Sequence, residues 1–157
     1  MPWTAYIDGG ARGNPGPAGV GVEIRNSDGD VVFSGGFFLG RQTNNAAEYA
    51  GLLAALDLLA RAKADPIEIV SDSQLMVRQI NGEYRVKAPQ LKVFYMEARR
   101  RLEGFNGWAM RHVYREENTA ADGRANEAMD MGEDVIATDT LKLTSEKRPS
   151  VEPDGLF

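Results

Sequence analysis

The chain has 157 residues and a net charge of −5, a length that suits one domain around one hydrophobic core. It contains no cysteine and a single histidine, His112, which excludes disulfides, thiol catalysis and zinc sites built from cysteine or from clustered histidines. No apolar run approaches the roughly 20 residues that span a bilayer, and the N-terminus lacks a signal peptide pattern, so we expect a cytoplasmic protein with no membrane partner.

The first predicted elements are three strands that form an antiparallel meander. They cover residues 3–8, 19–24 and 31–39, with turn-forming glycines and prolines at 9–17 and an Asn-Ser-Asp-Gly turn at 26–29. A long helix follows, because apolar side chains recur at helical spacing as far as about Lys63. Either Asn44 or Asn45 can N-cap this helix.

Helices and strands alternate in the second half of the chain. We expect a buried strand at 67–71 that is parallel to the first strand, helices at 73–80 and 89–102, a fifth strand at 108–114 and a last helix at 118–131. The order βββαβααβα predicts an α/β fold with a five-stranded mixed sheet flanked by helices. Residues 1–132 would form the domain, and residues 133–157 a tail that is mobile or adds an edge strand, for which the alternating stretch 140–144 is suited.

Four acidic residues lie at the ends of these elements. Asp8 ends the first strand and Asp72 follows the fourth, so both would emerge at the carboxyl edge of the sheet if the strands are adjacent and parallel. Glu48 and Asp122 lie near the starts of the two long helices. Each acid also has an ordinary explanation, because Asp8 can start a turn, Asp72 can N-cap a helix, and Glu48 and Asp122 can belong to capping boxes.

Converging carboxylates repel one another and raise one another's pKa values unless a cation lies between them. Oxygen ligands without histidine or cysteine favour Mg²⁺ or Mn²⁺ over zinc. Two such ions, roughly 3.5–4 Å apart, can activate a water and stabilise the leaving oxygen of a phosphodiester. The four acids therefore point to phosphoryl chemistry.

The charges are unevenly distributed in a way that fits a polyanionic partner. Between Met76 and Arg101 the chain has seven basic residues and two acidic ones, although the whole chain is acidic. A local basic surface suits a nucleic acid. The alternative is a solvated helix face.

Four motifs, in this order, closely resemble those of ribonuclease H type 1 domains: DGGARGNPGP at 8–17, TNNAAEY at 43–49, SDSQ at 71–74 and NTAADGRAN at 118–126. The resemblance extends from about Trp3 to Met131. It implies the ribonuclease H-like fold, a catalytic domain at 1–132, and hydrolysis of the RNA strand of RNA–DNA hybrids that leaves 5′-phosphate and 3′-hydroxyl ends. It also implies two Mg²⁺ ions, for which Mn²⁺ can substitute, bound by Asp8, Glu48, Asp72 and Asp122.

The resemblance further implies substrate contacts. Neutral side chains that donate and accept hydrogen bonds suit the 2′-hydroxyls of RNA, and two others match a pocket for a DNA phosphate. The RNA set is Asn14, Asn44, Asn45 and Gln74, and the phosphate set is Arg41 and Thr43. Gly9 is a further expected substrate-binding residue.

This chain departs from the family pattern in three places. Only residues 81–88 join the two middle helices, so Arg85 and Lys87 would provide a reduced version of the basic protrusion of many bacterial members. The loop before Asp122 lacks the usual histidine, and Arg115 would assist catalysis in its place, whereas His112 is expected to be structural. Gly123 would loosen the last helix.

Three other functions remain open from the sequence. The chain could be another nuclease of the same fold, although its asparagines suit 2′-hydroxyls, or a non-catalytic hybrid-binding module, although it has all four acids. A nucleotide-binding protein is disfavoured, since the glycine-rich loop lacks the lysine and hydroxyl of a phosphate loop. No obligate protein partner is implied, and a monomer is expected.

Overall fold

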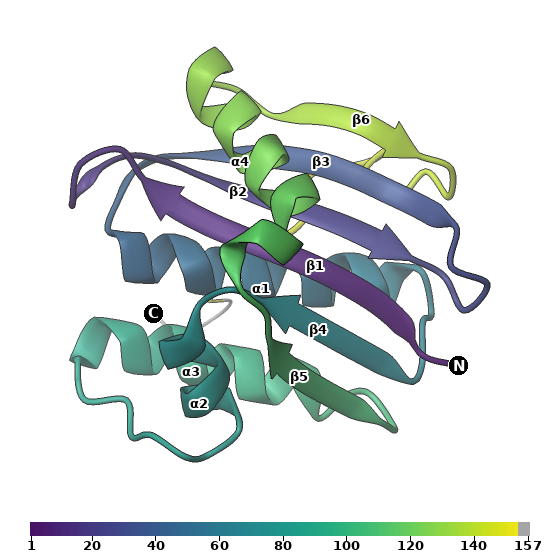
Figure 1. Cartoon of the computed structure of the whole chain (residues 1–157), viewed down its shortest axis with the longest axis horizontal. Helices are drawn as coiled ribbons and strands as arrows, with labels where there is room; N and C mark the ends of the chain where they lie inside the picture. The colour runs from purple at the N-terminus through teal and green to yellow at the C-terminus, as the bar shows by residue number, and fades with distance from the viewer. Residues whose placement is uncertain (154–157) are drawn as a thin grey trace.

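The computed structural model describes residues 1–153, which are built around one mixed β-sheet (Figure 1). The strands lie in the order β5-β4-β1-β2-β3-β6. The first three form the predicted antiparallel meander, and β4 and β5 run parallel to β1. Their bounds are β1 Trp3–Ala11, β2 Gly16–Arg25, β3 Val31–Gln42, β4 Ile67–Ser71, β5 Trp108–His112 and β6 Val135–Asp139. The predicted fold class is confirmed, with six strands in place of five.

Helices cover both faces of the sheet (Figure 1). Helix α1 lies on one face with α3 packed against it, and α4 crosses the other face over β2 and β3. Helix α1 is apolar almost all round because it is enclosed between the sheet and α3, and its leucines are at most 1% exposed. The bounds are α1 Asn44–Arg61, α2 Gln74–Ile80, α3 Pro89–Leu102, the 3-10 turn η1 Arg115–Glu117 and α4 Thr119–Met131. Within residues 1–153, no helix is both long enough and apolar enough to cross a membrane.

The sixth strand comes from the segment that the sequence left open between a mobile tail and an edge strand. After Gly132 ends α4 with a φ of 65°, β6 pairs antiparallel with β3. The alternating stretch 140–144, the expected edge strand, is instead a turn, because the Asp139 carboxylate accepts hydrogen bonds from the backbone N–H groups of Leu143 and Thr144 at 2.7 and 2.9 Å. Lys142, at a φ of 54°, is also unsuited to a strand.

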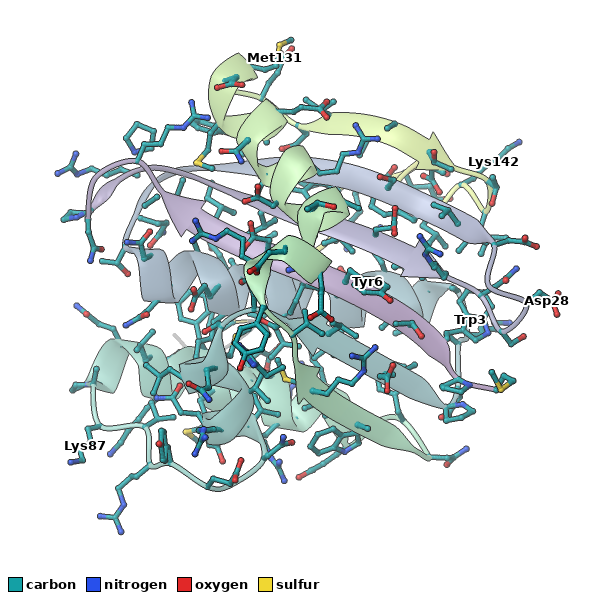
Figure 2. All side chains as sticks on the ribbon, in the orientation of Figure 1. Trp3, Tyr6, Asp28, Lys87, Met131 and Lys142 are labelled. Atoms are coloured by element: carbon teal, nitrogen blue, oxygen red, sulfur yellow. The ribbon has the colours of Figure 1, made fainter. Side chains whose placement is uncertain are left out.

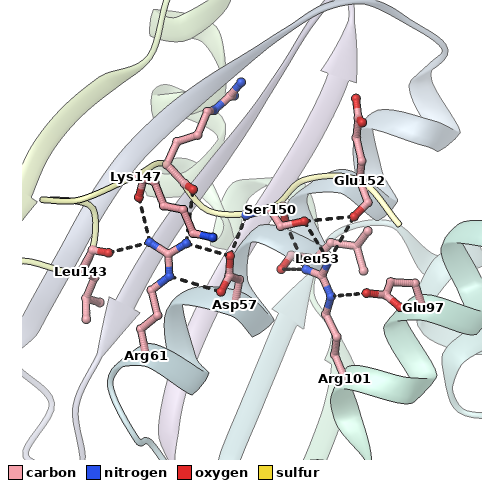
Figure 3. Close-up of polar contacts among 10 residues, drawn as sticks. Leu53, Asp57, Arg61, Glu97, Arg101, Leu143, Lys147, Ser150 and Glu152 are labelled. Atoms are coloured by element: carbon pink, nitrogen blue, oxygen red, sulfur yellow. Dashed lines mark hydrogen bonds and ion pairs between the residues drawn. The ribbon is translucent and has the colours of Figure 1, made fainter. Parts of the chain in front are cut away.

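Residues 140–153, here called the C-terminal strap, are held against α1 and α3 by two arginines (Figure 3). The Arg61 guanidinium pairs with Asp57 at 3.0 Å and donates to three strap carbonyls, those of residues 143, 147 and 148. The Arg101 guanidinium donates to the carbonyls of Ser150 and Glu152, each at 3.0 Å. Residues 133–153 are therefore fixed in place, and the other four residues of the expected tail lie outside the described part of the chain.

A buried carboxylate anchors the second of these arginines. Glu97 is 2% exposed, and its carboxylate accepts hydrogen bonds from Arg100 at 2.7 Å and from Arg101 at 2.9 Å. These bonds, that from Arg100 first, lower the pKa of Glu97 to about 2 in spite of its burial. Because Glu97 stays charged, Arg101 is held in the orientation that binds the strap.

We expect Arg61→Met to lower the melting temperature by roughly 4–8 °C, because a charged donor to three carbonyls is lost and the methionine keeps the apolar stem. Differential scanning calorimetry measures the shift. The control is Arg111→Met, which removes an exposed ion pair to Glu68 at 3.3 Å and should shift the melting temperature by no more than about 2 °C. Equal shifts in the two variants would show that the strap adds no stability.

Candidate active site

Two of the four predicted acids emerge side by side at the carboxyl edge of the sheet. Strands β1 and β4 are adjacent and parallel, and Ile7 and Ser71 are their last pair in register. Asp8 and Asp72 are the next residues on the two strands, as the sequence predicted. Strand β1 differs from the prediction in length, since it continues along β2 as far as Ala11. Asp8 therefore sits on a paired backbone and not at a loose strand end.

Helix α1 brings Glu48 to the same edge, but its start differs from the prediction. Thr43 is the N-cap, and its hydroxyl accepts a hydrogen bond from the N–H of Ala46 at 3.2 Å. Glu48 is therefore the fifth helical residue and does not belong to a capping box. Its carboxylate instead accepts a hydrogen bond from the hydroxyl of Ser73 at 2.6 Å.

The expected N-caps of α1 and α2 were wrong, and Asn44 has partners in another part of the chain instead. The Asn44 side-chain oxygen accepts a hydrogen bond from the backbone N–H of Ala11 at 2.7 Å, and the Asn44 N–H donates to the side chain of Asn14 at 3.1 Å. Likewise Ser73, not Asp72, is the N-cap of α2. Asp72 is thus not used for capping, and the loop that follows β1 is tied to the start of α1.

Two glycines allow the helices to approach the sheet closely. A Cβ atom at Gly9 would lie 2.3 Å from the carbonyl oxygen of Ala47 in α1, and one at Gly21 would overlap the carbonyl of Ala121 in α4. Any side chain at these positions would force the helices outward. The acids that follow, Glu48 and Asp122, would move away from Asp8 with them.

The electrostatics of the site centre on Asp8. Burial, the charge of Asp72 and the neighbouring Asp122, which is within hydrogen-bonding reach, raise the pKa of Asp8 to about 8, against a smaller opposing effect of the Gly9 N–H. Burial also raises the pKa of Glu48; the Ser73 hydroxyl opposes this rise and the charge of Asp72 adds to it. Asp8 is thus close to two other acids, and Glu48 to one of them. The meeting of all four carboxylates at one ion site stays a prediction.

The donor set fits a hard divalent cation, since it consists of carboxylates alone and their crowding favours a neutralising charge. In this arrangement, no three Asp, Glu or His side chains among residues 1–153 are gathered closely enough to hold an ion together. The carboxylates therefore converge on one place without forming a closed ligand cage.

The predicted substrate residues fall into two separate groups. Asn14, Thr43 and Asn45 line one groove, which continues along α3 at Gln90 and Phe94. The remaining predicted substrate residues do not line this groove. Arg41, Gln74, Arg85 and Lys87 are exposed, Gly9 is buried against α1, and Asn44 joins α1 to the loop after β1.

The basic residues of the short connection between α2 and α3 face solvent. Lys87 projects outward from it (Figure 2). Arg115 is exposed in the turn η1, which leads into α4. His112 is half-buried in β5, with its ring edge-on to Tyr114 at 5.4 Å.

The sequence analysis missed two residues that hold the acids. Ser73 bonds Glu48, and Asn118 is buried between α4 and β1. The SDS and NTAAD motifs contain both residues, but their partners are 25 and 111 positions away in the sequence. The spacing of residues along the sequence does not predict hydrogen bonds between positions so far apart.

Comparison with known proteins places this architecture in a family. The family model described as reverse transcriptase-like matches residues 6–128, most of the chain. Ribonuclease HI of Halobacterium salinarum is 47% identical over 126 residues, and the crystal structure of RNase H1 from that archaeon has a TM-score of 0.80, with 82% of this chain and 98% of that chain covered. The chain belongs to the ribonuclease H type 1 family.

A second structure, that of LC11-RNase H1 in complex with an RNA/DNA hybrid, is 39% identical in sequence to this chain. The superposition has a TM-score of 0.77 and includes 83% of this chain and 98% of the LC11-RNase H1 chain. The bifunctional protein Rv2228c of Mycobacterium tuberculosis is 38% identical over 146 residues, or 91% of this chain. The chain spans 63% of the archaeal ribonuclease HI and 40% of Rv2228c. It therefore corresponds to one part of these longer proteins.

The raised pKa of Asp8 predicts that the metal-free protein loses stability as the pH rises. The folded state holds a proton that the unfolded state releases near pH 4, so the favourable contribution is complete below about pH 4 and is lost as the pH approaches about 8. Asp8→Asn removes this titration. Its melting temperature in chelator should rise relative to that of the unsubstituted protein between these pH values.

Thermal unfolding from pH 4 to pH 9 tests this expectation, and Asp130→Asn, at an exposed ion pair with Arg12, is the control. A constant difference between Asp8→Asn and the unsubstituted protein across the range would mean that Asp8 has an ordinary pKa. Added Mg²⁺ should stabilise the unsubstituted protein most at the upper end of the range, where the carboxylates are ionised.

Proposed function

We propose that this protein is an endoribonuclease that hydrolyses the RNA strand of RNA–DNA hybrids. The observation that carries the proposal is the convergence of Asp72 and Asp122 on Asp8, beside a groove lined by Asn14 and Asn45. Similarity to ribonuclease HI and to a ribonuclease H1 solved with an RNA/DNA hybrid supports the same substrate. A non-catalytic binding module would have no need for crowded acids that oppose one another's ionisation.

We assign two Mg²⁺ ions, or Mn²⁺ in their place, to Asp8, Glu48, Asp72 and Asp122. When bound, the ions supply activation of a water and stabilisation of the leaving oxygen. Asp8 would be a central ligand of this site, since Asp72 and Asp122 both act on its carboxylate. Because like charges repel, we attribute the final approach of the four carboxylates to the cations.

The other residues of the site bind and orient the hybrid in this proposal. The carboxamides of Asn14, Asn44 and Asn45, with that of Gln74, can both donate to and accept from a ribose 2′-hydroxyl, which distinguishes RNA from DNA. Gly9 lets α1, which carries Asn44 and Asn45, pack closely on β1. Arg41 and Thr43 would hold a phosphate of the DNA strand. Arg85 and Lys87 would grip the backbone through charge.

Hydrolysis adds water across the bond between phosphorus and the 3′ oxygen, so the products have 5′-phosphate and 3′-hydroxyl ends. Residues 1–132 would supply every group that touches the hybrid. Strand β6 would extend the sheet beside β3, and the C-terminal strap would brace α1 and α3. We propose that the domain acts as a monomer, because no residue assigned to the site requires a second copy.

One assay tests the proposal against its rivals. Labelled RNA–DNA hybrid, duplex RNA, duplex DNA and a duplex with one embedded ribonucleotide are each incubated with Mg²⁺, Mn²⁺ or chelator. We expect cleavage of the uniform hybrid alone, only with a divalent ion. Cleavage of duplex DNA would favour another nuclease of this fold, and binding without cleavage would favour a binding module.

We expect Asp8→Asn to reduce hybrid hydrolysis below detection and to leave hybrid binding in chelator within about twofold of the unsubstituted protein. The asparagine keeps the shape of the side chain but removes the shared negative ligand. Single-turnover cleavage and fluorescence anisotropy measure the two quantities. Asp130→Asn, on the exposed end of α4, should retain full activity. Turnover that survives in Asp8→Asn would remove Asp8 from the mechanism.

Arg115→Ala is expected to lower kcat more than it raises KM. Arg115 begins the turn η1 and accepts through its carbonyl the N–H of Asn118 at 2.9 Å, so its exposed side chain stands beside the start of the helix that carries Asp122. Steady-state kinetics on a uniform hybrid, with Arg111→Ala as the control on β5, separate the two constants. An unchanged kcat would assign the helper role to another residue.

A further inference from the structure

The side chain of Asn118 is buried where α4 meets the sheet, and none of the roles described so far accounts for it. Asn118 is 1% exposed, and its Nδ2 donates a hydrogen bond to the carbonyl oxygen of Ile7 at 2.8 Å. Its Oδ1 is also buried and has no partner among the residues that the structure describes. Burying a carboxamide whose oxygen has no hydrogen-bond partner costs free energy. The role of the hydrogen bond that its nitrogen donates therefore has to be explained.

The bond lies at the point where the acids leave the sheet. Ile7 is the last residue of β1 in register with β4, and Asp8 follows it directly, as Asp72 follows Ser71. The Asn118 carboxamide binds the β1 backbone at this junction. It thus attaches the start of α4 to β1, one residue before Asp8.

The backbone of Asn118 holds the other acid. Its carbonyl accepts a hydrogen bond from the N–H of Asp122 at 3.1 Å, which closes the first turn of α4. One residue therefore joins the backbone before Asp8 to the backbone at Asp122. Two hydrogen bonds through Asn118 thus connect the backbone next to Asp8 with that of Asp122.

An ordinary capping role does not account for the side chain. A capping asparagine uses its oxygen to accept from an N–H group in the first helical turn. Asn118 is at the N-cap position of α4 but makes no such side-chain bond, and it uses its N–H₂ group on β1 instead. The side chain serves the contact between helix and sheet.

We propose that Asn118 is a positioning residue that sets the distance between Asp122 and the Asp8–Asp72 pair, and thereby the affinity of the site for divalent metal ions. The inference rests on the proposed function for the identity of the ligands, but it concerns metal binding and can be measured without a hybrid. It requires a side chain that donates a hydrogen bond. An aspartate of the same shape would present oxygen to the Ile7 carbonyl and add a further charge near the acids.

The test compares Asn118→Ala and Asn118→Asp with the unsubstituted protein. Isothermal titration calorimetry with Mn²⁺ alone measures metal affinity, and the Mg²⁺ concentration at half-maximal hybrid cleavage gives a second value. Loss of a residue that orients metal ligands typically weakens metal affinity by about 10–100-fold. We expect a loss of this size for both variants, partial recovery of kcat at saturating Mg²⁺, and unchanged hybrid affinity in chelator.

Asn81→Ala is the matched control. The Asn81 Nδ2 also donates to a strand carbonyl, that of Met110 at 3.0 Å, but at the far end of α2. Its loss should lower the melting temperature and leave Mn²⁺ affinity within about twofold. A purely structural role of Asn118 would produce the same pattern in Asn118→Ala, and this result would overturn the inference. If Asn118→Ala does not fold, Asn118→Asp, which has no donor, is titrated alone. Mn²⁺ affinity equal to that of the unsubstituted protein then overturns the inference equally.

The two proposals fail in different ways. Hybrid cleavage by the unsubstituted protein, together with normal Mn²⁺ affinity in the Asn118 variants, would overturn the positioning role and leave the ribonuclease assignment standing. Weakened Mn²⁺ affinity in these variants, together with no cleavage by the unsubstituted protein, would support the positioning role and overturn the ribonuclease assignment.

Discussion

The parallel pairing of β1 with β4 is the constraint on which the site depends. It ends at Ile7 and Ser71, so the chain delivers Asp8 and Asp72 at neighbouring points of one sheet edge. Every other feature of the site is arranged around this pair. Helix α1 approaches over Gly9, α4 approaches over Gly21, and each helix brings one more acid to the same edge. Without this strand register, the close packing of α1 and α4 on the sheet would not bring Glu48 and Asp122 near Asp8 and Asp72.

The arrangement opposes the protein's own stability. Burial and neighbouring carboxylates raise the pKa of Asp8 to about 8, so an ionised site is unfavourable in the folded chain until a cation offsets the charge. The stability of the folded chain comes from parts of the structure away from the acids. The leucines of α1 are enclosed on both sides, and the C-terminal strap is bound by Arg61 and Arg101 on the face of α1 that is away from the acids. A rigid body of this kind can hold like charges together.

Hydrogen bonds from neutral side chains complete the site. Ser73 bonds Glu48, Asn118 bonds the strand before Asp8, and Asn44 joins α1 to the loop after β1. None of these residues carries charge, so they orient the acids without adding to the repulsion. The acids serve as ligands and the neutral side chains as hydrogen-bonding supports, which accounts for the serine and asparagine residues in the motifs around the acids.

The amino-acid sequence by itself predicted the fold class and the positions of Asp8 and Asp72 directly after two strands, because hydrophobic periodicity marks helices and strands along the chain. Only the tertiary structure decided which polar residue caps a helix and which one joins two elements of the fold. Thr43 caps α1 where Asn44 or Asn45 was expected, and Asn44 instead has partners at Ala11 and Asn14. The strap and Asn118 are likewise defined by partners 49 to 111 positions away. Short polar side chains are nearly interchangeable within a helix turn, so only the groups that folding brings beside them select among their roles.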